Sequence, residues 1–389
     1  MSQTAPRLDR RSLIRMGAAL GGLQALGGCA TVASQPTSLL MPAPGLAPVR
    51  ARPENIFNIT VCSRPFRAAG PRLDAETVGD KLVVHNYGHG GSGWSLSWGS
   101  AEIVVGKALA GGEKDIAVIG CGAMGLTAAI TAQRAGARVT IYAKELMPDV
   151  RSARATGVWS PDSRIALSSQ APAGFDVLWE QMCRRSWKTY ARYLGVDGEP
   201  VSWTDRYVLS DKPFAPSADP MGFAHYERMV PDLTPRPQTL APGEHPFRVA
   251  HARRVPTLMF NVMELGRTLM GDFLVAGGRL EVMDFKSPAD LAALKQKVVI
   301  NCTGYGARAL WKDETVTPVR GQLAWLPAQP EVTYGLYYRH VSMLARRDGI
   351  ILQQTGADES YGYGIEDERP DRAEAEAAIR TIAALFAKA

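Results

Sequence analysis

A glycine-rich turn between an apolar strand and a helix, in the middle of the chain, most constrains the fold. Residues 115–119 are a β-branched run that suits a buried parallel strand, and residues 120–125 follow with the pattern G-x-G-x-x-G. Helix-forming residues continue from 126 to 135, and residues 138–143 suit a second strand. This order predicts a βαβ unit of the dinucleotide-binding type.

Each glycine of this turn has its own physical task. Gly120 permits the tight turn, Gly122 lets the backbone approach a pyrophosphate, and Gly125 allows the helix to pack closely on the strand. The helix would start at Ala123 and Met124, so its positive dipole end would face the phosphates.

Composition, charge and cysteine spacing exclude other classes of function. The chain has 389 residues and a formal net charge of +6, of which half comes from the first 28 residues. The remainder has no basic stripe, so we expect no nucleic-acid partner. The five cysteines lack CxxC spacing, and His85 and His89 lie in a glycine-rich turn without acidic or thiolate neighbours, so we predict no metal site.

The first 55 residues are typical of an export signal followed by a tether. Within residues 1–28, Arg10 and Arg11 precede a weakly apolar stretch that is too short to span a bilayer. A lipobox-like Leu-Gly-Gly precedes Cys29, and residues 29–55, rich in Pro and Ala, indicate a flexible tether. We expect a mature protein in the periplasm or cell envelope, held to the membrane only by lipid on Cys29. Simple cleavage without lipidation is the alternative.

Several further segments are similar to one known family. Residues 155–161 read A-T-G-V-W-S-P, residues 298–304 read V-V-I-N-C-T-G, and residues 320–322 read R-G-Q. The most specific block is H-N-Y-G-H-G-G-S-G-W over residues 85–94, preceded by R-P-F-R over residues 64–67. Together with the glycine turn, these segments resemble the D-amino-acid oxidase and D-aspartate oxidase family.

The order of these segments differs from that of the family. The block of residues 60–99 comes last in the family, whereas here it precedes the glycine turn. The chain ends in a helix pattern over residues 371–388, where an unpermuted relative would continue into the arginine segment. The resemblance therefore implies a circular permutation, with Phe57 and Ala387 close in space. The arginine segment should then pair with a strand near residues 349–353.

The resemblance implies an α/β fold with two structural domains. One is a Rossmann-type FAD-binding domain, and the other is a substrate domain built as a mixed-sheet α+β unit. We assign residues 56–157, with 258–310 and 356–389, to the FAD-binding domain. We assign residues 158–257, with 311–355, to the substrate domain.

The resemblance also implies FAD as cofactor and names its contacts. Lys144 occupies the strand-end place of the family's ribose-binding acid, so Glu145 is our candidate; Arg151 and Ser152 stand where the family has phosphate-binding Thr or Ser. A helix starting near Ser95 would direct its dipole at the flavin. The expected cofactor contacts are Gly90, Gly91, Gly93, Trp94, Ser95, Gly120, Gly122, Ala123, Met124, Gly125, Glu145, Arg151, Ser152, Gly157, Val158, Trp159 and Gly304.

The implied reaction is the oxidative deamination of a D-amino acid. Hydride would pass from Cα to flavin N5, giving a 2-oxo acid, ammonia and, with molecular oxygen as acceptor, hydrogen peroxide. By the family match, Arg67 would bind the substrate carboxylate as a bidentate pair, and Gly91 would contact the amine through its backbone. Tyr338 fits the family's first pocket tyrosine, while the second falls near Ser342 or Met343 and is missing.

Three alternatives remain open at the level of sequence. D-aspartate oxidase would need a basic contact for a second carboxylate, for which Arg164, Arg339 and His340 are candidates. An FAD-dependent amino-acid dehydrogenase would pass electrons to an envelope acceptor instead of oxygen. A non-catalytic binding lipoprotein is the third, and retention of Arg67 and both glycine motifs argues against it.

Overall fold

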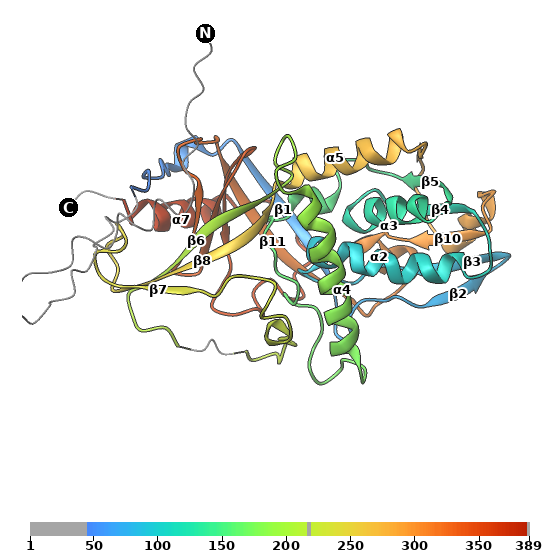
Figure 1. Cartoon of the computed structure of the whole chain (residues 1–389), viewed down its shortest axis with the longest axis horizontal. Helices are drawn as coiled ribbons and strands as arrows, with labels where there is room; N and C mark the ends of the chain where they lie inside the picture. The colour runs from blue at the N-terminus through green and yellow to red at the C-terminus, as the bar shows by residue number, and fades with distance from the viewer. Residues whose placement is uncertain (1–44, 216–218, 387–389) are drawn as a thin grey trace, which may run out of the picture. The chain divides into compact units, whose positions relative to one another are not determined.

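The computed structural model describes residues 45–215 and 219–386, which form two β-sheets with flanking helices (Figure 1). The twin arginines and Cys29 lie outside the described residues, as does Ala387. None of the helices in the described part of the chain is both long and apolar enough to cross a membrane.

The six-stranded sheet contains the predicted βαβ unit. Its order is β2 (Ala75–Val78), β3 (Lys81–His85), β10 (Val298–Asn301), β4 (Asp115–Ile119), β5 (Arg138–Ala143) and β9 (Arg279–Val282). All neighbours pair in parallel except β2 and β3. Helices α2 (Gly93–Leu109) and α3 (Ala123–Arg134) pack side by side against this sheet, which buries most of their side chains (Figure 1). The sequence-based prediction of β4, α3 and β5 is confirmed.

The eight-stranded sheet contains the arginine segment at one edge. Its order is β1 (Asn58–Arg67), β11 (Val316–Leu326), β14 (Gly349–Gln354), β13 (Val341–Arg346), β12 (Tyr334–Tyr338), β6 (Val201–Ser210), β8 (His251–Phe260) and β7 (Gln238–Leu240). Strand β1 pairs antiparallel with β11 along its whole length, from Asn58 opposite Trp325 to Arg67 opposite Val316. The expected neighbour of β1, the strand at 349–353, is therefore one strand further away, because β11 lies between them.

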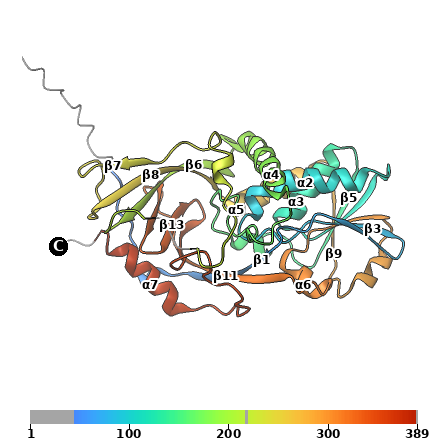
Figure 2. The ribbon, with the colours of Figure 1, turned by 90° about the horizontal axis from the view of Figure 1, so that it is seen from below.

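The remaining helices lie around the two sheets. They are α4 (Phe175–Tyr190), α5 (Val262–Val275), α6 (Ala307–Leu310) and α7 (Arg372–Ala383). Short 3₁₀ helices are η1 (Pro53–Asn55), η2 (Arg151–Arg154), η3 (Ala191–Tyr193), η4 (Glu227–Met229), η5 (Pro288–Ala293) and η6 (Gly304–Gly306). Figure 2 shows α7 beside the eight-stranded sheet and α2, α3 and α4 clustered over the other sheet.

The segment before β1 belongs to the folded core rather than to the tether. Val49 and Ala51 are buried in one apolar cluster with Ile379 of α7. The Tyr334 hydroxyl donates to the carbonyl oxygen of Ala47 at 2.7 Å. The predicted tether over residues 29–55 is therefore wrong for its last part, because apolar burial and hydrogen bonds hold this part on the eight-stranded sheet.

The predicted domain boundaries need two corrections. Strand β1 and helix α7, assigned by sequence to the FAD-binding domain, belong to the eight-stranded sheet, since the apolar face of α7 packs on β11 and β14. Helix α4, assigned to the substrate domain, packs instead on α2. The missing side chain of Gly99 allows this approach, because a Cβ atom there would overlap the backbone of Met182.

Candidate flavin and substrate site

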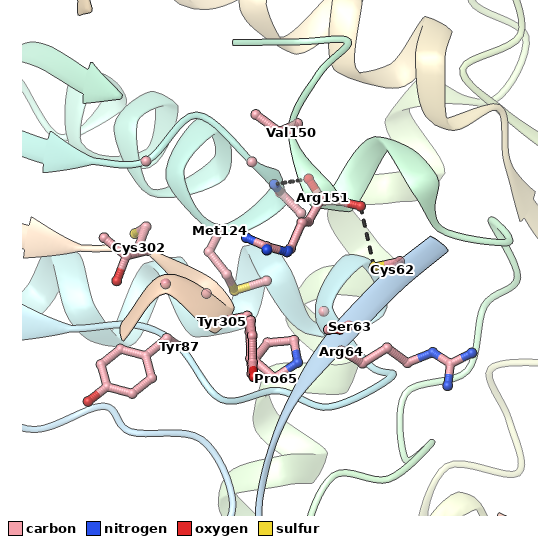
Figure 3. A pocket seen from close by; sticks show the side chains of 18 of the residues that line it. Cys62, Ser63, Arg64, Pro65, Tyr87, Met124, Val150, Arg151, Cys302 and Tyr305 are labelled. Atoms are coloured by element: carbon pink, nitrogen blue, oxygen red, sulfur yellow. Dashed lines mark hydrogen bonds between the residues drawn. The ribbon is translucent and has the colours of Figure 1, made fainter. Parts of the chain in front are cut away.

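A cavity of about 490 Å³ brings together segments that lie far apart in the sequence (Figure 3). Its wall includes the glycine turn after β4 and the glycine loop of residues 88–93. The side of β1 and residues from β11 and β14 also contribute to it. This volume is typical of a small-molecule or cofactor site.

The glycine turn opens the N-terminus of α3 onto the cavity. Gly120 has φ +104°, and a Cβ atom there would lie 2.5 Å from the carbonyl oxygen of Cys302. A Cβ atom at Gly125 would overlap the carbonyl oxygen of Gly120, so the predicted close packing of helix on strand is confirmed. Gly122 and Ala123 line the cavity itself. The turn therefore has the shape that lets a pyrophosphate reach backbone N–H groups.

Ser152 lies directly at this helix N-terminus. Its Oγ accepts a hydrogen bond from the backbone N–H of Ala123 at 3.0 Å, and its carbonyl oxygen accepts one from Trp94 Nε1 at 2.9 Å. Met124 also lines the cavity beside them. One residue thus joins the glycine turn to the start of α2, although the two are distant in sequence.

Charged side chains near the end of β5 and in η2 also line the cavity. Lys144 and Glu145 both do so, with Lys144 Nζ 3.9 Å from Glu145 Oε1. Arg151 lines it too, but its guanidinium forms two hydrogen bonds with Glu368 at 3.1 and 3.2 Å and lies over the ring of Tyr305. Burial disfavours the charged form of Arg151, yet the bonds to Glu368 raise its pKa above the ordinary value. Arg151 therefore already has a carboxylate partner.

The glycine loop forms another part of the cavity wall. Gly90, with φ +54°, Gly91, Gly93 and Trp94 all line it. A Cβ atom at Gly90 would overlap the carbonyl oxygen of Arg164, and the Gly91 N–H donates to the carbonyl oxygen of Ser163 at 2.9 Å. A side chain at Gly90 or Gly91 would push the loop away from Ser163 and Arg164, against which it packs.

Five of the expected cofactor contacts lie outside the cavity lining, whereas Gly304 lies in it. Gly125 packs α3 on β4. Gly157 accepts from the N–H of Phe260 at 2.7 Å and Trp159 donates to Leu258 at 2.9 Å, and Val158 forms a bridge with Met259. The Ser95 hydroxyl accepts from the N–H of Ser160 at 2.9 Å. These hydrogen bonds fasten the segment after η2 to β8 and α2.

The two predicted substrate side chains, Arg67 and Tyr338, also lie outside the cavity lining. Arg67 Nε donates to Thr315 Oγ1 at 2.9 Å, and its Nη1 donates to the carbonyl oxygen of Gly70 at 3.0 Å. The Tyr338 hydroxyl lies 3.1 Å from both carboxylate oxygens of Asp211. Both groups therefore have protein partners away from the cavity.

The structure brings Arg64 to the cavity instead. Successive side chains of a strand alternate between its two faces, so residues 64 and 67 point to opposite sides. In Figure 3 the Arg64 side chain extends from β1 away from Tyr87 and Tyr305. It makes no hydrogen bond or ion pair with any other residue that the structure describes. Strand alternation was the sequence signal that could have separated the two arginines.

Among the arginines that line the cavity, Arg64 is the one whose guanidinium has no hydrogen bond or ion pair with another described residue. Burial, with the positive charge of Arg164 adding to it, lowers the pKa of Arg64 to about 10, which keeps the guanidinium charged at neutral pH. The other arginines that line the cavity have partners: Arg151 pairs with Glu368, and Arg154 donates to the carbonyl oxygen of Val61 at 3.2 Å.

The titratable groups of the cavity wall near β1 and the glycine turn are not poised for proton transfer at neutral pH. Burial raises the pKa of Cys121 to about 11 and that of Cys302 to about 12, and it also raises that of Cys62. Burial lowers the pKa of His89 to about 3. These four groups are therefore poor proton donors and acceptors at neutral pH, and the cavity suits a reaction that needs no strong protein base.

The fold and the cavity together define an α/β protein with two β-sheets and a glycine turn of the dinucleotide-binding type. The family described as "DAO: FAD dependent oxidoreductase" matches residues 115–389, and the chain belongs to this family.

Individual relatives show moderate similarity. The chain is 28% identical over 294 residues to the D-amino-acid oxidase of Streptomyces coelicolor, covering 70% of this chain and 78% of that protein. It is 23% identical over 269 residues to the D-amino acid oxidase of Dugesia ryukyuensis, covering 65% and 73%. Among solved structures, glycine oxidase from Geobacillus kaustophilus gives a TM-score of 0.48 at 16% identity, covering 70% and 77%.

The protein is thus an FAD-dependent oxidoreductase, and the residues that line its cavity fit the cofactor. The turn at Gly120–Gly125 and the N-terminus of α3 would hold the pyrophosphate. Glu145 lines the same cavity and would bind a ribose hydroxyl. The glycine loop and Thr303 lie along the rest of the same cavity.

Proposed function

We propose that this protein oxidises the Cα–N bond of a D-amino acid and passes the electrons to oxygen. The observation that carries the proposal is the partner-free guanidinium of Arg64 in the cavity that the glycine turn and glycine loop enclose. Bound FAD would supply the two-electron acceptor for the Cα–H bond. The choice of the D-enantiomer and of oxygen is supported by the names of the relatives.

The chain's own residues would bind and orient the substrate. A planar, permanently charged guanidinium binds a carboxylate through two parallel hydrogen bonds, so Arg64 would hold the substrate carboxylate. The backbone of Gly91 lies in the same cavity for contact with the amine. Because the neutral amine supplies its own electron push, the raised pKa of Cys62 and the low pKa of His89 are compatible with this reaction.

The substrate that fits best carries a single carboxylate. The three side chains that could hold a second carboxylate lie outside the cavity lining. Arg164 Nε donates to the carbonyl oxygen of Glu359 at 2.6 Å, and Arg339 pairs with Asp211 at 2.8 Å. His340 follows Arg339 in the hairpin turn between β12 and β13. We therefore propose a neutral D-amino acid in preference to D-aspartate.

A peroxide assay under air tests this function. The purified holoprotein is expected to release peroxide with neutral D-amino acids and far less with D-aspartate or L-amino acids. Bleaching of the flavin by substrate without release of peroxide would indicate that the electrons pass to an acceptor other than oxygen. The absence of both signals across all D-amino acids would contradict the proposed reaction.

We further infer that the chain is circularly permuted relative to its family. The supporting observation is that the two ends of the described fold share one apolar cluster, which contains Val49 and Ala51 from one end and Leu385 from the other. Strand β3 and the glycine loop after it also join the sheet and the cavity of the segment that matches the family.

We also propose export by the twin-arginine route and lipidation of Cys29. The support is the sequence of residues 1–29 alone. Replacing Cys29 with alanine should move the protein from the membrane fraction to the soluble or unprocessed fraction. Replacing Arg10 and Arg11 with lysine should retain it in the cytoplasm. Unchanged membrane fractionation of the Cys29 variant would contradict lipidation.

A further inference from the structure

A second polar side chain without a partner lies beside Arg64 in the cavity. Gln353, at the end of β14, lines the cavity with only 8% of its surface exposed. Its side-chain amide makes no hydrogen bond with another residue in the described ranges. A largely buried side chain whose amide has no protein partner can receive its hydrogen bonds from a ligand in the cavity, so this side chain points to a ligand.

Gly321 of β11 brings the two side chains together. A Cβ atom at Gly321 would overlap Arg64 Nη2 and would lie 3.1 Å from Gln353 Nε2. Both nitrogen atoms therefore lie against the same backbone position, and both residues line the same cavity. Each nitrogen is a hydrogen-bond donor, so the ligand between them must offer acceptor oxygens.

We propose that Gln353 is a substrate-binding residue that completes the carboxylate site of Arg64. The amide donates to one carboxylate oxygen while the guanidinium binds the carboxylate with its own N–H groups. This inference rests on the proposed function and deepens it, because it assigns a residue to the role that Tyr338 does not fill.

The strand supplies a matched control for this residue. Gln354 follows Gln353 on β14, and its side chain points to the opposite face of the strand. Gln354 does not line the cavity. The same substitution at positions 353 and 354 therefore separates the loss of the cavity amide from any general effect on β14.

The test is a titration of the purified holoprotein with pyruvate, followed by calorimetry and by the change in flavin absorbance. Gln353→Met keeps the volume and removes the donor, so the dissociation constant should rise about 10- to 100-fold, as expected for a hydrogen bond to a charged group. Gln353→Glu should weaken binding at least as much, because its carboxylate would pair with Arg64. Gln354→Met should bind pyruvate as the parent does.

FAD content and melting temperature keep the result interpretable. Both should match the parent in Gln353→Met, which shows that the cavity is otherwise intact. A dissociation constant within twofold of the parent in Gln353→Met and Gln353→Glu overturns the proposal, as does a parent holoprotein that binds no pyruvate. Peroxide release is measured separately, so failure to oxidise any amino acid would count against the proposed function while the titration still decides the role of Gln353.

Discussion

Two arginines three residues apart on β1 have different environments. Arg64 faces the cavity without a protein partner, whereas Arg67 bonds Thr315 and the carbonyl oxygen of Gly70 and lies 3.5 Å from Asp313. The Cδ atom of Arg67 also lies where a side chain at Gly88 would be, 2.5 Å from the Cβ position. Arg67 thus supports the start of the glycine loop from outside the cavity.

Alanine substitutions of Arg64 and Arg67 should affect different properties of the enzyme. Arg64→Ala removes the carboxylate partner, a cost of about 3–5 kcal/mol, so kcat/KM should fall by about two to four orders of magnitude with FAD retained. Arg67→Ala should instead weaken FAD binding and lower the melting temperature, while KM changes little once FAD is saturating. Steady-state kinetics and FAD titration measure the two effects. An unchanged KM in Arg64→Ala would contradict the assignment.

His89 makes the stability of the glycine loop sensitive to acid. It is 1% exposed, Nε2 lies 2.9 Å from Ser100 Oγ, and Nδ1 has no partner in the described residues. Burial lowers its folded-state pKa to about 3 from the ordinary 6.5. Between these two values the unfolded chain binds more protons than the folded one, so the free energy of unfolding falls as the pH falls.

The acid sensitivity can be measured by thermal or urea unfolding at several pH values. Below pH 6.5 this histidine should cost the parent about 1.4 kcal/mol of unfolding free energy per pH unit. His89→Gln, which does not titrate, should flatten that slope even if it is less stable at pH 7. Equal slopes for the parent and the variant between pH 6.5 and 4.5 would assign the acid sensitivity to other groups.

At the scale of secondary-structure elements, the buried inner face of α7 holds this helix on the eight-stranded sheet. The Asp371 carboxylate caps its N-terminus by accepting from the N–H of Glu374 at 3.1 Å. Its inner face places Ile379 and Ile382, both fully buried, against the eight-stranded sheet and the segment around Val49. The helix therefore links the end of the described fold to its beginning.

Truncation of that inner face should destabilise the eight-stranded sheet. Ile379→Ala leaves a cavity in a filled core and should lower the free energy of unfolding by about 2–5 kcal/mol. Arg380→Ala, on the exposed face, should cost less than about 1 kcal/mol, since it loses only a surface ion pair with Glu376. Urea unfolding curves compare the two. A similar small loss for both would mean that α7 packs only loosely.

At the scale of the whole molecule, the permutation should change chain connectivity and leave the packed contacts intact. The shared apolar cluster of Val49, Ala51 and Leu385 predicts that a short linker can join residue 389 to residue 45. A chain that starts at Glu113, runs to Ala389 and continues through a linker into residues 45–110 should fold and bind FAD. The change in loop closure is expected to cost only about 1–2 kcal/mol.

Melting temperature and FAD content measure this outcome. The rearranged chain should keep both close to the parent values. A matched chain that continues into residues 56–110 alone lacks Val49 and Ala51 and should be less stable. An insoluble or FAD-free rearranged chain, beside a parent that folds under the same conditions, would contradict the inferred permutation.

Local sequence is sufficient for β4, α3 and β5 because each depends on neighbouring residues. A β-branched run, a glycine turn and a run of helix-forming residues, in this order, predict a strand, a tight turn and a helix. The family motifs at 85–94 and 120–125 likewise predicted two walls of the cavity. These are short-range patterns, so neither their order along the chain nor their separation mattered.

Only the tertiary structure decided which polar side chains face the cavity and which have protein partners. Arg67 is occupied by Thr315, a partner almost 250 residues away in the chain, and no local pattern could show this. The same holds for Gln353. Its strand β14 is separated from Arg64 on β1 by β11, and the two side chains lie close together because Gly321 of β11 has no side chain. Burial and hydrogen bonding between distant segments depend on how the sheets pack, and that packing is a property of the folded chain.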